Sequence, residues 1–183
     1  MTALQNLKYA QWFKGADVDG DGFITQDDVR MMSERYISAR GAAPDSASAR
    51  LLTEGMDGFW RNVIAPMDQD GDGRVDLREM TEGFRRVLTD PALYPQQVEQ
   101  VTDCFFDLVD LNGDGTIDQA EFRQMFDAVA GVPGDDCAMV FAALDRDGSG
   151  ALDRAEFHQA LKEFFYGDDP GAPANHLFGR VAV

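Results

Sequence analysis

The stretch DVDGDGFITQDD, Asp17 to Asp28, alternates aspartates with small residues and closes on a further pair of aspartates. Carboxylates held within a few ångströms repel one another, so this segment needs a cation to form a stable loop. Oxygen donors without a neighbouring His or Cys favour a hard ion such as Ca²⁺ or Mg²⁺, because zinc and copper prefer imidazole or thiolate. The stretch therefore predicts a loop that binds a divalent metal ion.

The spacing within this first loop narrows the choice of ion. A twelve-residue loop wraps one calcium ion with oxygens from positions 1, 3, 5, 7, 9 and 12, and a glycine at position 6 makes the sharp turn. Here that glycine is Gly22, and Ile24 at position 8 suits a short strand that pairs with a sister loop. The predicted ligands are Asp17, Asp19, Asp21, the backbone carbonyl of Phe23, Thr25 and Asp28.

The same pattern recurs three times along the chain, and each repeat has glycine at position 6. DQDGDGRVDLRE offers Asp68, Asp70, Asp72, the carbonyl of Arg74, Asp76 and Glu79. DLNGDGTIDQAE offers Asp110, Asn112, Asp114, the carbonyl of Thr116, Asp118 and Glu121. DRDGSGALDRAE offers Asp145, Asp147, Ser149, the carbonyl of Ala151, Asp153 and Glu156. Four complete matches resemble the EF-hand motif and predict up to four bound Ca²⁺ ions.

Apolar residues flank every loop at helical spacing. The residues four places before each first ligand are Phe13, Ile64, Phe106 and Phe141. Apolar pairs that share one helical face follow each loop: Val29 and Met32, Met80 and Phe84, Phe122 and Phe126, Phe157 and Leu161. We therefore expect an all-α fold of four helix–loop–helix units.

The residues at position 8 of each loop predict how these units pair. Ile24 should face Val75, and Ile117 should face Leu152, which gives two compact lobes with short two-stranded pairings. The proline-containing stretch TDPALYPQQ separates the lobes. We expect an N-terminal pair over residues 1–90, a C-terminal pair over 91–166, and a tail over 167–183 whose apolar end packs on the core.

Three features extend the resemblance to a narrower family. They are the wide gap between loops one and two, Asp28 at position 12, and ALKEFFYGDDPGAP, Ala160 to Pro173, after the last loop. With these, nearly the whole chain resembles the sarcoplasmic calcium-binding proteins and bacterial relatives such as calerythrin. The resemblance implies two lobes packed face to face and a buffering role. Loop two departs from the pattern, because many family members have lost its ligands whereas Asp68 to Glu79 is intact here.

Loop one differs from the others at its last ligand. Asp28 is one methylene shorter than Glu79, Glu121 or Glu156, so it should give the ion a single oxygen and leave a smaller site. This predicts that loop one binds Mg²⁺ and Ca²⁺ competitively. Alternatively, the loop contracts and binds calcium as the others do.

Three functions remain open from the sequence. A calcium buffer or signal modulator is favoured by the four loops and the resemblance. A calcium sensor would instead expose an apolar groove to a partner protein, and Met31, Met32, Met80 and Met125 suit such adaptable recognition. Binding of an apolar small molecule between the lobes is a third alternative, as in the related photoproteins. Its candidate lining is Trp12, Trp60, Tyr9, Tyr36, Tyr166, His158 and His176.

Composition excludes several other classes. With 33 acidic against 16 basic residues the net charge is −17, which disfavours nucleic acid and anionic membranes as partners. No apolar run is long enough to span a bilayer, and the N-terminus lacks the basic and apolar regions of a signal peptide, so we expect a cytoplasmic protein. No recognisable nucleophile arrangement is present, and we expect no enzyme. Cys104 and Cys137 should be small core residues rather than a disulfide.

Overall fold

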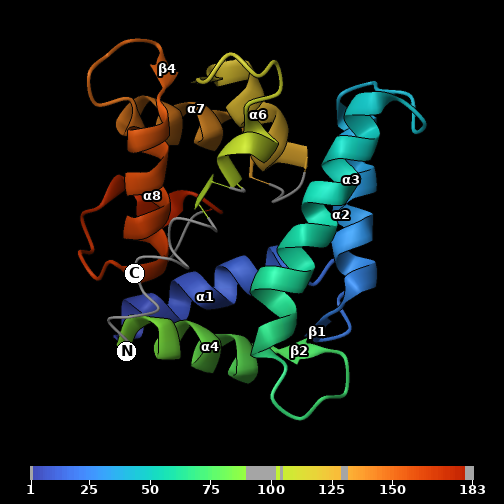
Figure 1. Cartoon of the computed structure of the whole chain (residues 1–183). Coiled ribbons are helices and arrows are strands. Elements are labelled where there is room, and N and C mark those ends of the chain that lie inside the picture. The colour runs from blue at the N-terminus through green and yellow to red at the C-terminus, as the bar shows by residue number, and fades with distance from the viewer. Residues whose placement is uncertain (1, 90–101, 104, 129–131, 180–183) are drawn as a thin grey trace.

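The computed structural model describes residues 2–89, 102–103, 105–128 and 132–179, and it is helical apart from the loops and two small strand pairings (Figure 1). The helices of the N-terminal pair of units are α1 (Ala3–Ala16), α2 (Gln26–Ala39), α3 (Ala47–Phe59) and α4 (Leu77–Thr89). Between α3 and loop two the chain forms a π-helix, η1 (Trp60–Ile64), and then a 3-10 turn, η2 (Ala65–Met67). The predicted all-α fold class is confirmed.

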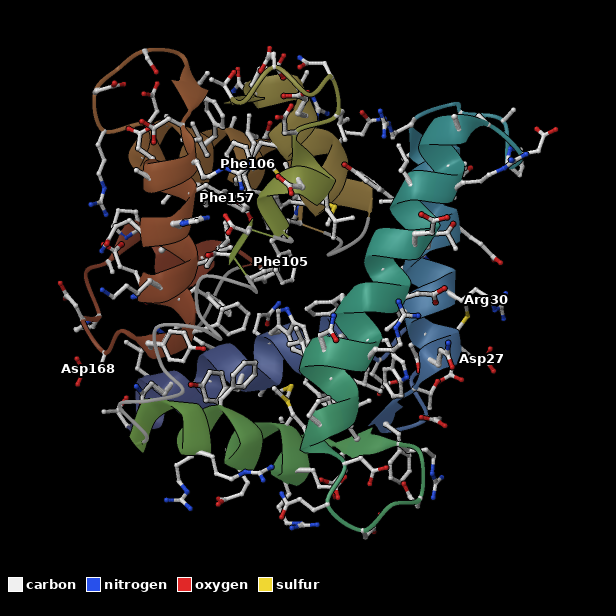
Figure 2. The ribbon with its side chains drawn as sticks, viewed as in Figure 1. Asp27, Arg30, Phe105, Phe106, Phe157 and Asp168 are labelled. Atoms are coloured by element: carbon white, nitrogen blue, oxygen red, sulfur yellow. The ribbon has the colours of Figure 1, made fainter. Side chains whose placement is uncertain are left out.

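The C-terminal pair repeats this arrangement. Residues 105–109 are helical and lead into loop three. The elements that follow are α6 (Gln119–Ala128), α7 (Gly134–Leu144), α8 (Arg154–Tyr166) and the 3-10 turn η3 (Pro173–His176). Figure 2 shows Phe106 and Phe157 side by side between the 105–109 helix and α8, with ring centroids 5.9 Å apart. The apolar residues that flank the loops therefore meet inside the pair.

Two short antiparallel strand pairings join the loops. In the N-terminal pair β1 (Phe23–Ile24) lies beside β2 (Val75–Asp76), and Ile24 is opposite Val75. In the C-terminal pair β3 (Ile117–Asp118) lies beside β4 (Ala151–Leu152), and Ile117 is opposite Leu152. These are the predicted partners, and all four side chains are fully buried. Each pairing therefore joins two loops through a buried apolar contact.

The two pairs are packed against each other around one aromatic core. In Figure 1 helix α1 crosses the middle of the molecule between α4 and α8, and both helices contact it. The Trp12 ring meets Phe165 edge-on at 6.0 Å, and Phe84 stacks on Phe165 at 5.0 Å. Elsewhere in the core, the ring centre of Phe59 in α3 lies 5.1 Å from that of Phe105. Aromatic side chains from both pairs thus share one core.

Helix α1 also makes polar contacts with the end of α8. The Lys8 ammonium is fully buried, and its Nζ donates to the carbonyls of Glu163 at 2.8 Å and Gly167 at 2.7 Å. The Tyr9 hydroxyl donates to the carbonyl of Phe165 at 2.6 Å. The carbonyl of Glu163 also accepts from the capping amide of Gly167 at 3.0 Å, so Lys8 adds a second donor there and supplies one to the cap residue Gly167.

The tail after α8 returns to the core over the described residues. Ala174, Leu177 and Phe178 are buried, and the Phe178 ring lies 4.7 Å from that of Phe164. Gln11 of α1 donates to the carbonyl of Phe178 at 3.0 Å. Three places named from the sequence lie outside the described residues: the expected boundary near residue 90, the residue Cys104, and the final residues 180–183.

No helix in the described part of the chain combines the length and apolar character needed to cross a membrane. Cys137, the other cysteine, is buried as expected.

Candidate metal centre

Each loop is organised by its first carboxylate and its turn glycine. The glycines at position 6 have φ between 83° and 91°, a conformation that side chains with a Cβ rarely adopt. Their amides donate to the carboxylate of position 1 in all four loops: Gly22 to Asp17 at 3.0 Å, Gly73 to Asp68, Gly115 to Asp110 and Gly150 to Asp145 at 2.9 Å. The glycine spacing therefore folds the loop around its first predicted ligand.

Positions 9 and 12 of each loop bind each other. In loop one Thr25 accepts from the amide of Asp28, and Asp28 accepts in return from the amide of Thr25. The corresponding reciprocal pairs in the other loops are Asp76 with Glu79, Asp118 with Glu121, and Asp153 with Glu156. This arrangement is the capping box that starts a helix. Two predicted ligands of every loop are thus fixed by the helix that follows it.

Within each of three loops, three carboxylates come close together. One oxygen from each of Asp17, Asp19 and Asp28 lies within 4.8 Å of the others. Loop four has a group at the same positions 1, 3 and 12, and loop two has one at positions 1, 3 and 5. The members of those two groups are Asp68, Asp70, Asp72, Asp145, Asp147 and Glu156. The spacing fits oxygens arranged around calcium, whose Ca–O distance of roughly 2.4 Å allows separations of up to about 5 Å. In loop three, Asn112 stands where the other loops have an aspartate.

Asp28 reaches the backbone amides near the start of its loop, as the glutamate at position 12 does in the other loops. Its Oδ1 accepts from the amide of Val18 at 2.8 Å, and in loop three Glu121 Oε1 accepts from the amide of Leu111 at 2.9 Å. Asp28 is fully buried, whereas Glu121 is 6% exposed. The shorter side chain of Asp28 therefore makes the same backbone hydrogen bond as Glu121 does in loop three.

The middle ligands are held by backbone donors. The amide of position 5 donates to the side chain at position 3 in every loop, at 2.7–3.2 Å. Such donors stabilise the ionised form, and the amide of Ser149 lowers the pKa of Asp147, at position 3, below its ordinary range. The amide of Gly73 likewise lowers the pKa of Asp68, at position 1. The Thr116 hydroxyl has the same effect on the pKa of Asp114. These carboxylates are charged at neutral pH and available to a cation.

The four loops nevertheless differ at positions 5 and 7. In loop four the Ser149 hydroxyl donates to the carbonyl of Ala151 at 2.8 Å, which is the carbonyl predicted as a ligand. In loop two the guanidinium of Arg74 pairs with Asp72 at 2.9 Å. From the sequence, only the backbone carbonyl of Arg74 was predicted to contact the ion, and the ion pair of its side chain was missed. The position of Arg74 two residues after Asp72 could have indicated that pair.

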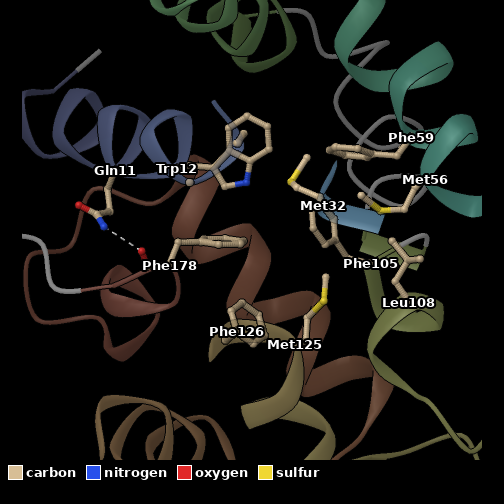
Figure 3. A pocket seen from close by; sticks show the side chains of 12 residues that line it. Gln11, Trp12, Met32, Met56, Phe59, Phe105, Leu108, Met125, Phe126 and Phe178 are labelled. Atoms are coloured by element: carbon tan, nitrogen blue, oxygen red, sulfur yellow. Dashed lines mark hydrogen bonds between the residues drawn. The ribbon is translucent and has the colours of Figure 1, made fainter. Parts of the chain in front are cut away.

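A small apolar cavity lies between the two pairs, and none of the predicted ligands lines it (Figure 3). Its volume is about 50 Å³, and Met32, Met56 and Met125 contribute flexible side chains to the lining. The aromatic lining is Trp12, Phe59, Phe105, Phe126 and Phe178. Of the residues that the sequence suggested for such a cavity, Trp12 is the one in this lining.

Family models recognise all four units. The model described as EF hand matches residues 9–33, 67–84 and 103–126, and a second, described as EF-hand domain, matches residues 136–167. These segments contain the four loops with their flanking residues.

Individual relatives agree with that assignment. A sarcoplasmic calcium-binding protein from Hediste diversicolor is 29% identical over 119 residues, which is 65% of this chain and 66% of the relative. The chain spans less than two thirds of the length of three curated relatives, between 42% and 66%.

Solved structures match almost end to end. A Streptomyces coelicolor calcium-binding protein is 26% identical, with a TM-score of 0.72 over 88% of this chain and 97% of the other. The coelenterazine-binding protein of Renilla muelleri has a TM-score of 0.75 at 22% identity, over 98% of this chain and 99% of the other. At this level of identity, the likeness to the Renilla muelleri protein shows a shared fold and nothing further.

Proposed function

Because this chain belongs to the EF-hand family of calcium-binding proteins, we propose that it buffers calcium or modulates calcium signals, with up to four ions held in its four loops. The observation that carries the buffering role is the burial of the apolar helix faces between the two pairs. Met32 and Met125 are 7% and 6% exposed, and Met80 is fully buried. A sensor needs such methionines at its surface when calcium is bound.

The tail supports the same proposal. Phe178 lies among aromatic side chains of both the 105–109 helix and α8, at 6.4 Å from Phe105 and 4.7 Å from Phe164. Within the described part of the chain, the large apolar side chains that are exposed are Leu7, Leu51, Leu77 and Met139, on four different helices. Side chains scattered in this way do not form a groove for a partner helix.

The proposed ligands are the twenty-four groups named from the sequence, six for each loop. The carboxylates among them would supply the negative charge that a divalent ion requires, and the carbonyls at position 7 would complete an oxygen sphere. We propose that loop one also takes Mg²⁺, since an aspartate at position 12 favours a tighter sphere than a glutamate does. With the acids committed to the loops, we propose no catalytic role.

The first experiment measures apolar surface and calcium together. A dye that fluoresces on apolar surfaces is mixed with the Mg²⁺-loaded protein, calcium is added, and calorimetry follows ion binding in parallel. We expect a flat or falling dye signal while calcium binds. A rising signal would contradict buffering and favour the sensor.

Ion counting tests the ligand assignment. Glu79→Gln, Glu121→Gln and Glu156→Gln should each remove about one calcium ion or weaken one site strongly, because the residue at position 12 supplies up to two oxygens. Glu82→Gln is the matched control, since Glu82 lies one turn further along α4 and pairs with Arg85. An unchanged count in the position-12 variants would contradict the assignment.

A regulatory role is the second candidate. The Streptomyces coelicolor protein, which is 26% identical to this chain, is described as acting in prokaryotic calcium-mediated regulation. The dye experiment separates this role from buffering.

Binding of an apolar small molecule is less well supported. The interpair cavity measures about 50 Å³, whereas a cavity of about 150 Å³ is the size known to admit benzene. A larger guest would have to displace the three methionines. The name of the Renilla muelleri neighbour specifies coelenterazine for that protein alone.

A further inference from the structure

Loop two has the highest ligand charge of the four loops. Its side-chain ligands Asp68, Asp70, Asp72, Asp76 and Glu79 are all carboxylates. Each of the other loops replaces one of them with a neutral residue: Thr25, Asn112 or Ser149. More carboxylates attract calcium more strongly, but they also repel one another more when the ion is absent.

An arginine lies directly on this cluster. Arg74 Nη2 is 2.9 Å and Nε is 3.2 Å from Asp72 Oδ2, while the amide of the same arginine donates to Asp72 Oδ1 at 2.9 Å. Both oxygens of this predicted ligand therefore accept hydrogen bonds from Arg74. The charges of Asp21 and Asp70 also attract the guanidinium.

A ring from the neighbouring loop holds the other side of the guanidinium. Arg74 Cζ lies 4.1 Å from the centre of the Phe23 ring, a cation–π contact between loop two and loop one. The β1–β2 pairing places Phe23 opposite Asp76, so the ring is fixed beside this arginine. Arg74 is thus oriented toward Asp72 by two separate contacts.

Corresponding positions in the other loops carry no such cation. Position 7 is Phe23 in loop one, Thr116 in loop three and Ala151 in loop four. In loop three the second oxygen of Asp114 accepts from the neutral amide of Asn112 at 3.0 Å. A full positive charge at position 7 therefore distinguishes loop two by sequence.

We propose that Arg74 is a tethered cation that sets the calcium affinity of loop two by competing with the ion for Asp72. In the metal-free loop the guanidinium relieves the repulsion among the aspartates. When calcium enters, Asp72 must be shared or released by Arg74, so binding is weaker and release faster than five carboxylates alone would give. This inference rests on the proposed calcium site in loop two, and it makes the most acidic loop an exchangeable one.

The test compares two charge removals within one loop. Arg74→Gln removes the paired cation but keeps the backbone carbonyl. Arg78→Gln is the matched control, because Arg78 is 70% exposed and approaches Asp76 and Glu79 only to 3.9 Å. Calcium is titrated into the full chain, and the amide resonances of Gly73 and Gly22 report loops two and one separately.

We expect Arg74→Gln to tighten loop two by about three- to fivefold, the range of an exposed ion pair, and Arg78→Gln to tighten it by less than about twofold. Calcium release from loop two should slow by a similar factor in Arg74→Gln. Equal effects of the two variants, or weaker binding in Arg74→Gln, would overturn the proposal. If calcium does not shift the Gly73 resonance of the wild-type protein, loop two does not bind calcium. That result would overturn the proposed loop-two site and this inference with it.

A second readout compares stability with and without calcium. With chelator present, the melting temperature of Arg74→Gln should fall below that of Arg78→Gln, because the repulsion among the aspartates is no longer relieved. With saturating calcium the order should reverse. The same order in both conditions would show that Arg74 is a structural residue and would overturn the competition.

Discussion

At the scale of single residues, Asp28 shows that a loop can adjust to a shorter ligand without losing its hydrogen bonds. The bonds to the amides of Val18 and Thr25 are kept, at 2.8 and 2.9 Å. The hypothesis from the sequence is that the shorter carboxylate of Asp28 gives the ion a single oxygen. A site with fewer oxygens would lower the cost of holding a small ion relative to a large one.

Asp28→Glu should therefore raise the preference of loop one for calcium over magnesium, by roughly tenfold or about 1.4 kcal/mol. Calcium titrations at several fixed Mg²⁺ concentrations, followed at the Gly22 amide, measure this preference. Asp27→Glu is the matched control, since the Asp27 carboxylate is 81% exposed and pairs with Arg30. An unchanged competition profile in Asp28→Glu would rule out the magnesium hypothesis.

The thiol of Cys137 gives a second prediction at this scale. The residue is 1% exposed, and burial raises its pKa to about 11. At pH 8 the thiolate should be about a hundredfold scarcer than in an ordinary thiol, and access is blocked as well. In a Cys104→Ser background a thiol reagent should react only after denaturant is added. Rapid reaction of the folded protein would contradict the buried position.

At the scale of helices and loops, local sequence predicts most of what is found. The position-8 residues gave the correct strand partners, because an apolar side chain in a polar loop has only the sister loop to pack against. The π-helix Trp60–Ile64 was not predicted, because its wide turn has no local signature and depends on how Trp60 and Ile64 reach the core. Lys8 was also missed, although its spacing with Leu4 and Trp12 places it on the buried face of α1.

Replacing Lys8 tests how much this contact stabilises α8. Lys8→Met keeps the volume but removes the Nζ donor from the carbonyls of Glu163 and Gly167, and it also removes a buried charge. The carbonyl of Glu163 keeps the amide of Gly167 as a donor at 3.0 Å. We expect a net loss of about 1–2 kcal/mol in the free energy of unfolding at pH 7. Lys14→Met is the matched control, because Lys14 is an exposed lysine of the same helix. Denaturant titration of both variants, with calcium saturating, makes the comparison.

The same lysine should make stability depend on pH. Desolvation lowers its pKa from 10.5 to about 8, against the attraction of Asp168 and Glu163. Between these values the unfolded chain holds the proton and the folded chain has released it, so rising pH favours folding. Below pH 8 both states are protonated and this contribution is constant. The stability of wild type relative to Lys8→Met should therefore rise from pH 8 to 10, and a flat difference would contradict it.

At the scale of the whole molecule, the tail and both pairs share one core. The sequence predicted an apolar tail end that packs inward. It did not predict which residues the tail contacts, because Phe178 meets rings contributed by residues far away in the chain. The ring of Phe105 lies 6.4 Å and the ring of Phe126 lies 5.4 Å from that of Phe178. Long-range contacts of this kind leave no periodic trace in a single sequence.

Phe178→Ala should remove about 3 kcal/mol or more from the free energy of unfolding and increase the binding of an apolar-surface dye to the calcium-loaded protein. Met139→Ala is the control, since Met139 is 54% exposed and its truncation opens no cavity. Thermal unfolding and dye fluorescence measure the two effects. Parent-like dye binding by Phe178→Ala would mean that the tail does not cover the core.

The contacts of α1 also bear on how the protein is made. Lys8 and Gln11 take their partners from Glu163, Gly167 and Phe178, more than 150 positions later in the chain. A ribosome releases the N-terminal helix long before those residues exist, and long-range contacts of this kind form late in folding. The apolar face of α1 therefore lacks its contacts with α8 and the tail until synthesis is nearly finished. A nascent chain stalled before α8 should be the form that aggregates or engages a chaperone.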